Sequence, residues 1–285
     1  MKKTLIALAV AASAVSGMAH AWTNGDFNGS VDIGGSITAD DYRQKWSWAV
    51  GSDINGFSNA LTDLTEGGTK LTITVNGDKP ILLGKTNEAF STPVAGGVGA
   101  IPQIAFTDYE GASVEIKSPE GEINKGLAYL VLPMKNAEGT KVGSVKVNAS
   151  YAGVALGSTK GRYANLFSVY GGAANRIFNG GIPANVAQAE LTSGIAAAQR
   201  TALFGSLSKD ELTAQLQAVE PAAAADVRDY GRSSSTSMAA SVNSATSAAY
   251  ALGIANGQTI EATFDQAVTA STQWSAPLNV AVTYN

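Results

Sequence analysis

The sequence predicts a mainly β protein, an antiparallel sandwich or barrel whose strands are interrupted by a partly helical segment. From residue 22 to about residue 152, short runs of alternating apolar and polar residues are separated by Gly, Pro, Asn and Asp, which is typical of strands joined by turns. Between residues 153 and 247, Ala becomes frequent and helix signals appear. Alternation returns at residues 258–264 and again at the C-terminal end.

Four segments of the first β stretch carry strand signals. Two of them end at turn signals, Asn76-Gly77-Asp78 and Pro119-Glu-Gly121. One is a continuous apolar run, which suits a strand buried on both faces. The four segments are residues 70–75, 113–117, 127–132 and 141–151. Many short strands at near-regular spacing favour a sandwich or a barrel.

Helix signals are confined to the middle of the chain. Ser208 and Glu211 match a capping box, and apolar residues follow at helical spacing until Pro221 ends the pattern. Residues 184–204 are Ala-rich and are expected to hold one or two further short helices. Residues 233–247, nearly all Ser, Ala and Thr, are expected to form a surface loop.

This helical block predicts a domain organisation. Residues 154–247 are expected to be an inserted subdomain, and the two flanking β stretches, residues 41–153 and 248–285, are expected to form one β-domain. The N-terminal residues have a separate character. Lys2 and Lys3, the following apolar run and the Ala19-His20-Ala21 site predict a signal peptide over residues 1–21, and therefore export through a periplasm.

Composition excludes several classes of function. The chain has no Cys, and its single His lies within the predicted signal peptide. Ser-His-Asp and Cys-His catalysis are therefore excluded, because the general base is missing. Sites for zinc, haem and iron–sulfur clusters lack their usual ligands, and no disulfide can form. We expect no cofactor and no metal. The net charge of −4 disfavours nucleic acid as a partner.

Both ends of the exported chain carry strand patterns. The apolar or small face of the first pattern consists of Phe27, Gly29, Val31, Ile33, Gly35 and Ile37, and that of the last pattern consists of Leu278, Val280, Val282 and Tyr284. The two strands could pair within one chain and close the sheet. Alternatively, the N-terminal strand could fill a groove beside the C-terminal strand of another copy. Spacing alone does not separate these alternatives.

Few residues suggest catalysis or ligand binding. The Ser206-Leu-Ser-Lys209 pattern lacks its companion motifs, but the acidic pairs Asp40/Asp41 and Asp108/Glu110 leave open an exported, carboxylate-dependent carbohydrate-active enzyme. A second alternative is an outer-membrane β-barrel. In the middle segment, aromatic and planar polar side chains suited to sugars are Arg162, Tyr163, Tyr170 and Arg176, whereas Phe167 and Phe178 are expected to be core.

Most of the chain outside residues 154–247 resembles the major subunits of bacterial chaperone–usher fimbriae. It is most similar to subunits of the K88 (F4) type and to their relatives that form capsule-like surface antigens. The resemblance is carried by residues 26–40, 68–75, 104–114, 126–153, 248–264 and 271–284.

The resemblance implies an incomplete immunoglobulin-like sandwich that lacks its last strand. A periplasmic chaperone would lend a strand beside residues 278–284, and at an outer-membrane usher the donor strand of the next identical subunit, within residues 22–40, would replace it. The resemblance also implies a homopolymeric fimbria at the bacterial cell surface. Its subunits would bind host glycoconjugates through the inserted subdomain.

Overall fold

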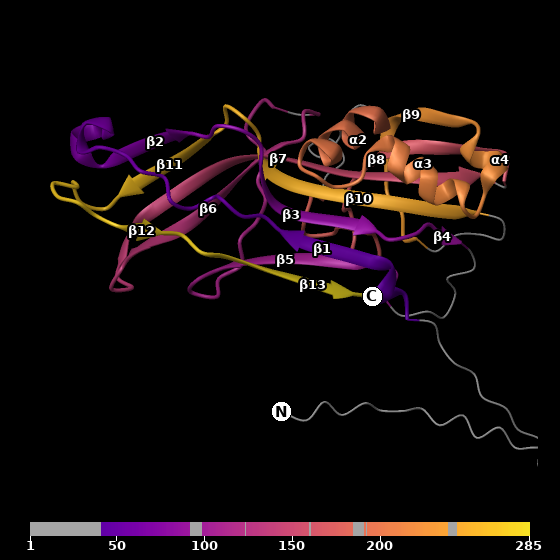
Figure 1. Cartoon of the computed structure of the whole chain (residues 1–285). Helices are drawn as coiled ribbons and strands as arrows, with labels where there is room; N and C mark the ends of the chain where they lie inside the picture. The colour runs from indigo at the N-terminus through magenta and orange to yellow at the C-terminus, as the bar shows by residue number, and fades with distance from the viewer. Residues whose placement is uncertain are drawn as a thin grey trace, which may run out of the picture. The chain divides into compact units, whose positions relative to one another are not determined.

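The computed structural model describes residues 41–91, 99–122, 124–159, 161–184, 191, 193–238 and 244–285. These residues belong to one compact unit, Ala39–Asn285. The unit is mainly β, with a few short helices (Figure 1), which confirms the expected fold class and is consistent with an immunoglobulin-like sandwich. The predicted signal peptide, residues 1–21, and the N-terminal strand at residues 22–40 lie outside the described residues.

The elements occur in the following order. The strands are β1 (Trp46–Val50), β2 (Lys70–Thr74), β3 (Lys79–Thr86), β4 (Phe90–Ser91), β5 (Pro102–Asp108), β6 (Leu127–Asn136), β7 (Lys141–Thr159), β8 (Tyr163–Val169), β9 (Val227–Ser234), β10 (Ala245–Ile254), β11 (Thr259–Phe264), β12 (Trp274–Ser275) and β13 (Leu278–Tyr284). The helices are the 3-10 helices η1 (Tyr42–Lys45), η2 (Leu61–Asp63) and η3 (Glu66–Gly68), and the α-helices α2 (Gly194–Leu203), α3 (Lys209–Gln217) and α4 (Pro221–Ala224).

The 19-residue strand β7 runs through the whole main sheet. Its first part pairs with β6 on one edge and with β11 on the other. Its second part pairs with β8 and β10. The sheet order is β1-β3-β10-β7-β11-β2, and all of these pairings are antiparallel. A strand of this length exceeds the usual 3–10 residues, so β7 serves two neighbouring parts of the sheet.

The two faces of β7 are buried against different layers. Val145, Val147 and Tyr151 point into the main core, as the period of two in a strand requires. On the opposite face Lys146 is partly exposed, but further along the strand that face carries Val154 and neighbouring apolar residues, which are fully buried. Here the helices cover the sheet, and the sequence accordingly changes from alternation to a continuous apolar run.

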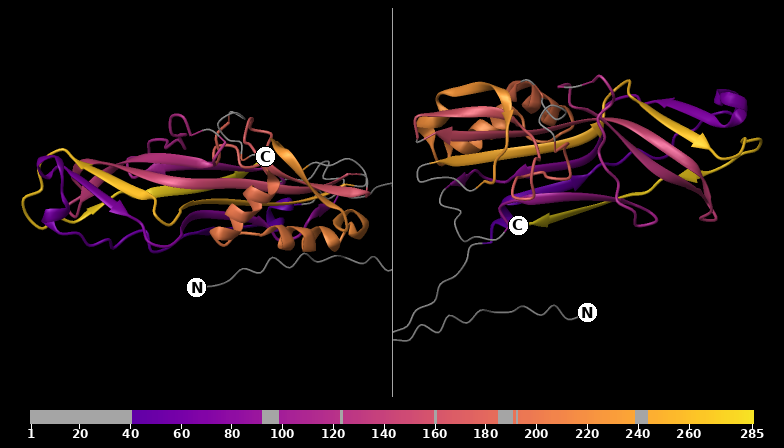
Figure 2. Two further views of the ribbon diagram at one scale, coloured as in Figure 1. Left: turned by 90° about the horizontal axis from the view of Figure 1, so that it is seen from above. Right: turned by 180° about the vertical axis from the view of Figure 1, so that it is seen from behind.

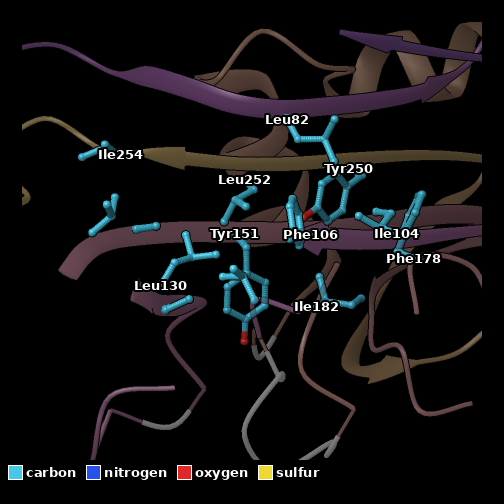
Figure 3. Close-up of a cluster of buried hydrophobic side chains, with 14 of the residues drawn as sticks. Leu82, Ile104, Phe106, Leu130, Tyr151, Phe178, Ile182, Tyr250, Leu252 and Ile254 are labelled. Atoms are coloured by element: carbon cyan, nitrogen blue, oxygen red, sulfur yellow. The ribbon is translucent and has the colours of Figure 1, made fainter. Parts of the chain in front are cut away.

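The main core fills the space between the large sheet and the two-stranded sheet β13-β5. Figure 3 shows Ile104 and Phe106 of β5 beside Tyr250 of β10, and Phe178 lies against the Tyr250 ring at 5.3 Å between centroids. The Tyr250 hydroxyl donates a hydrogen bond to the Gly181 carbonyl at 2.6 Å, so this buried polar group has a partner. The two sheets therefore form a sandwich.

A smaller core lies under the helices. It joins apolar residues of β7, β8 and β10 to the inner faces of α2, α3 and α4, and Figure 2 shows these helices on one face of the sheet. The helix α3 begins at the predicted capping box: Ser208 Oγ accepts from the Glu211 backbone N–H, and a Glu211 carboxylate oxygen accepts from the Ser208 backbone N–H at 2.7 Å. Leu212 and Leu216 of this helix are fully buried.

The expected strand at residues 113–117 is wrong. This segment forms only isolated bridges, Ser113 to Thr107 and Lys117 to Tyr129. The Asp108 carboxylate accepts backbone hydrogen bonds from Glu110 and Ala112, which turns the chain sharply after β5. The residues that follow cross from the small sheet to the edge of the main sheet, so they cannot form a ladder with either.

The expected domain boundaries fall inside continuous strands. The junction of residues 153 and 154 lies within β7, and the junction of residues 247 and 248 lies within β10. The middle segment therefore continues the main sheet and adds a helical layer to it. The helical layer and the sandwich share their central strands within one compact unit.

We predict that Leu212→Ala lowers the free energy of unfolding by about 2–5 kcal/mol, because it leaves a cavity between α3 and the sheet. Val219→Ala is the control, since Val219 is 40% exposed just after the same helix and should change stability by less than about 0.5 kcal/mol. Chemical denaturation measures both. Equal effects of the two substitutions would contradict the docking of α3 as a packed layer.

Candidate functional site: a groove beside the last strand

The last strand, β13, is paired on one edge only. Its seven residues pair with β5 in an antiparallel register from Leu278 opposite Asp108 to Tyr284 opposite Pro102. The other edge of β5 is covered. Backbone groups of residues 178 and 179 form hydrogen bonds with one end of it, and the Val114 backbone N–H donates a hydrogen bond near the other end. Within the described ranges, no strand pairs with the outer edge of β13. Such an edge is a template for another strand.

A groove with a volume of about 1290 Å³ lies beside this edge. One wall is formed by residues 50–61, and the other by residues 270–280, which include the first part of β13. The apolar floor belongs to the main core and consists of Leu71, Leu130, Leu132, Val145, Val147, Ile260 and Phe264. These floor residues are at most 9% exposed, so the groove lies directly over the main core, and a further strand would pack on top of it.

The edge strand β1 shows where the groove opens. Trp46, Trp48 and Val50 lie on one face of this strand. Trp46 is only 5% exposed, Trp48 is half-buried and Val50 is 71% exposed. Exposure rises along the strand because the sheets are in contact at its beginning and separate toward its end. Val50 accordingly lines the groove, whereas the two Trp residues do not.

The opposite end of the groove is closed by a hydrogen bond. The Trp48 indole Nε1–H donates to the Tyr284 hydroxyl oxygen at 2.9 Å, a contact that we call the Trp48–Tyr284 bridge. It joins β1 to β13 across the gap between the two sheets, and Figure 1 shows the C-terminus beside the η1–β1 segment. A β-carbon on Gly84 would lie 2.4 Å from a Trp48 ring carbon, so the indole position requires a glycine in β3.

The side chains of β13 alternate as the sequence predicts. Leu278, Val280, Val282 and Tyr284 pack against the main core, and the residues between them are exposed. Burial raises the pKa of Tyr284, while the hydrogen bond from Trp48 acts in the opposite direction. The phenol is therefore held in its neutral form within the core edge.

The four residues expected to bind glycans do not lie together. Arg162 and Tyr163 are at the turn where β8 begins, whereas Tyr170 follows the end of the same strand. At about 3.3 Å per residue, the backbones of Tyr163 and Tyr170 are about 23 Å apart. Arg176 lies near the small sheet, where its carbonyl accepts from the Gln103 side chain at 3.0 Å. Phe178 is core, as expected, and Phe167 is partly buried against the main core.

The structure adds a residue to the first of these places. The Arg228 guanidinium lies 4.0 Å from the centroid of the Tyr163 ring, and its Nε donates to Asp226 Oδ2 at 3.1 Å. Hydrogen bonding from Arg228 lowers the pKa of Asp226. Arg228 was not expected at this place, because β9 pairs with β8 in parallel and local sequence patterns do not predict a pairing between segments so far apart.

The motifs that suggested catalysis have structural roles. Ser206 Oγ donates to the Gly84 carbonyl at 2.8 Å, and Ser208 caps α3. The Asp108 carboxylate closes a turn, and Asp41 accepts hydrogen bonds from the Arg43 side chain. Among the described residues, no group of three or more His, Asp or Glu side chains is placed to hold a metal ion. No helix in the described part of the chain is long and apolar enough to cross a membrane.

Comparison with known proteins identifies the family of this chain. A family model of the K88 type, described as fimbrial major and minor subunits, matches residues 1–285. The chain belongs to the K88 family of fimbrial subunits. The K88 fimbrial proteins AB and AD of Escherichia coli are each 67% identical to it over 285 residues, and the alignments cover 100% of both chains. The F41 fimbrial protein of Escherichia coli is 29% identical over 295 residues, again over the full length of both.

Membership of the K88 family confirms the resemblance seen in the sequence. The chain is a structural subunit of a fimbria, exported and assembled with identical subunits at the bacterial cell surface. Its close relatives are structural fimbrial proteins, so the alternative of a carbohydrate-active enzyme is set aside. The groove therefore belongs to a protein that polymerises.

We predict that Tyr284 contributes to a loss of stability at high pH. In the unfolded chain the phenol ionises near pH 10, but burial raises its pKa in the folded subunit. The unfolded state therefore releases its proton first, and the free energy of unfolding falls as the pH rises above about 10. Tyr284→Phe should lose less stability than the wild type between about pH 9 and pH 11 in urea titrations. Identical pH dependence of the two chains would contradict this role.

Proposed function

We propose that this subunit polymerises by donor-strand exchange. Residues Phe27, Gly29, Val31, Ile33, Gly35 and Ile37 of one copy form the apolar face of a strand that fills the groove of the next copy. The strand pairs with the free edge of β13. The observation that carries this proposal is the groove itself, which combines an apolar floor from the main core with an unpaired strand edge.

A strand suits this groove better than a compact ligand does. The free edge of β13 leaves backbone N–H and C=O groups to be paired, and a guest strand pairs them in sequence. Alternate apolar side chains of the guest cover Leu130, Val147 and the rest of the floor. Residues 27–37 span about 36 Å when extended, which exceeds the about 23 Å of the seven-residue β13.

Strand donation between copies agrees with fibre formation. A strand that folded back into its own groove would complete the subunit and leave no link to a neighbour. A strand donated to the next copy covers the core of that copy and joins the two chains. We therefore extend the proposal to exchange in trans, with each subunit both donating residues 22–40 and accepting them beside β13.

The same groove accounts for two transient partners. Before assembly the unpaired edge of β13 and the exposed apolar side chains beside it, such as Val50 and Leu61, would promote aggregation. A periplasmic chaperone that lends a strand to β13 protects this surface, and an outer-membrane usher is the place where the donor strand of the next subunit replaces it. Removal of residues 1–21 as a signal peptide would precede both steps.

We predict that Ile33→Lys abolishes polymer formation, because a lysine on the apolar face would have to be buried in the groove. Asp32→Lys is the matched control, since the neighbouring side chain lies on the polar face of the same strand. Electron microscopy and size-exclusion chromatography of exported protein measure fibre length. Normal fibres from Ile33→Lys would contradict the donor-strand assignment, and so would equal loss of fibres from both variants, because the apolar face would then not be what decides assembly.

A second part of the proposed function is adhesion through glycans at Arg162, Tyr163 and Arg228. The supporting observation is the guanidinium of Arg228, held over the Tyr163 ring by Asp226 at the exposed edge of the sheet. An aromatic face packs on the apolar face of a sugar, and a fixed guanidinium donates hydrogen bonds to hydroxyl or carboxylate oxygens. Tyr170, which follows the far end of β8, and Arg176, which lies near the small sheet, are too distant to join the same site.

We predict that Tyr163→Ala and Arg228→Ala each weaken glycan binding at least tenfold, on a printed panel of neutral and sialylated oligosaccharides. Arg43→Ala is the matched control, because Arg43 forms the same kind of exposed pair with Asp41 at 2.7 Å but belongs to a different edge of the molecule. Binding that survives both Tyr163→Ala and Arg228→Ala would exclude this surface as the receptor site.

A further inference from the structure

The Trp48–Tyr284 bridge spans the gap that a guest strand would occupy. The groove is open beside Leu278 and Val280, which line it, but it ends before Val282 and Tyr284. At that end the indole of Trp48, from the edge strand β1, meets the hydroxyl of Tyr284, from the edge strand β13. One hydrogen bond between side chains thus connects two strands whose backbones are not paired.

Both partners of the bridge are held in place by other contacts. The Trp48 ring lies on the backbone of Gly84 and contacts the rings of Phe178 and Tyr250, at 6.3 and 6.2 Å between centroids. Tyr284 is fixed by its backbone register opposite Pro102 in β5. The next residue adds a hydrogen bond from its backbone N–H to the Ile101 carbonyl at 3.1 Å. The bridge is therefore a defined contact at the closed end.

A guest strand paired along the whole of β13 conflicts with this contact. Its backbone would lie beside Val282 and Tyr284, and its inward side chains would enter the space between β13 and β1. Trp48 and Tyr284 already meet across that space. The two sheets must separate at this end before the last part of β13 becomes accessible.

We propose that the Trp48–Tyr284 bridge holds one end of the empty groove closed and must break for a guest strand to pair with the full length of β13. This inference rests on the proposed strand-accepting role of the groove and concerns its regulation. The bridge slows the uptake of a strand and stabilises the empty subunit. It thereby lowers the rate at which an empty subunit takes up a strand other than its proper donor.

The experiment measures how fast the full chain takes up a labelled synthetic peptide of residues 27–37. Every chain carries Ile33→Lys, so that its own N-terminal strand does not compete for the groove. The bridge is removed from either side, by Trp48→Phe or by Tyr284→Phe, each of which keeps an aromatic ring. Fluorescence anisotropy of the peptide gives the uptake rate after the chain is refolded by dilution.

Trp46→Phe is the matched control. Trp46 stands two residues before Trp48 on the same face of β1, and its ring loses the same atoms in the substitution. Its buried indole Nε1–H, however, has no hydrogen-bond partner among the described residues. A change in uptake caused by ring volume alone would therefore occur in Trp46→Phe as well.

We expect uptake to be about fivefold faster for Trp48→Phe and for Tyr284→Phe, which corresponds to a hydrogen bond of about 1 kcal/mol. Trp46→Phe should leave the rate unchanged, and the double variant Trp48→Phe/Tyr284→Phe should be no faster than either single variant. Equal rates in all chains, or equal acceleration by Trp46→Phe, would overturn the bridge as a barrier but not the groove. No uptake by any chain at excess peptide would overturn the groove as a strand acceptor, and the bridge with it.

Discussion

Backbone pairing along β7 is the constraint on which the rest of the described structure depends. Its first part holds β6 and β11, which form the floor of the groove, and its second part holds β8 and β10, which carry the helices. Because side chains alternate between the two faces, one strand supplies Tyr151 to the sandwich core and Val154 to the core beneath the helices. The sandwich and the helical layer therefore cannot shift independently.

The groove follows from a sandwich whose sheets separate at one end. At the Trp48 end of β1, aromatic rings fill the space between the sheets, and Tyr284 completes the contact. Toward Val50 the loop after β1 covers the core only with partly buried side chains such as Ile54 and Phe57, and Leu130 and Val147 lie beneath them at the floor of the groove. Uncovered apolar surface beside an unpaired strand edge is unfavourable in water, and a strand removes both costs at once.

Patterns with a local cause could be predicted from the sequence, whereas patterns imposed by a distant layer could not. The alternation in β13 and the capping box of α3 are local, and both are present in the structure. Residues 233–247 were expected to form a surface loop, but Ala245 to Ser247 begin β10, and all ten residues of this strand are buried because α3 covers one face and the sandwich core covers the other. The contact of Arg228 with Tyr163 depends on the parallel pairing of β8 and β9, and the Trp48–Tyr284 bridge joins residues that are 236 positions apart in the sequence. Neither contact has a local sequence signal.

The continuity of β7 also has a mechanical consequence. A tensile load applied at the turn beside Tyr163, where β7 and β8 meet, would be transmitted along a strand that extends into the floor of the groove. The hydrogen bonds of an antiparallel ladder lie across the strand direction, so such a load shears many of them together instead of opening them one after another. A subunit at the surface of a moving bacterium would in this way resist traction without a disulfide.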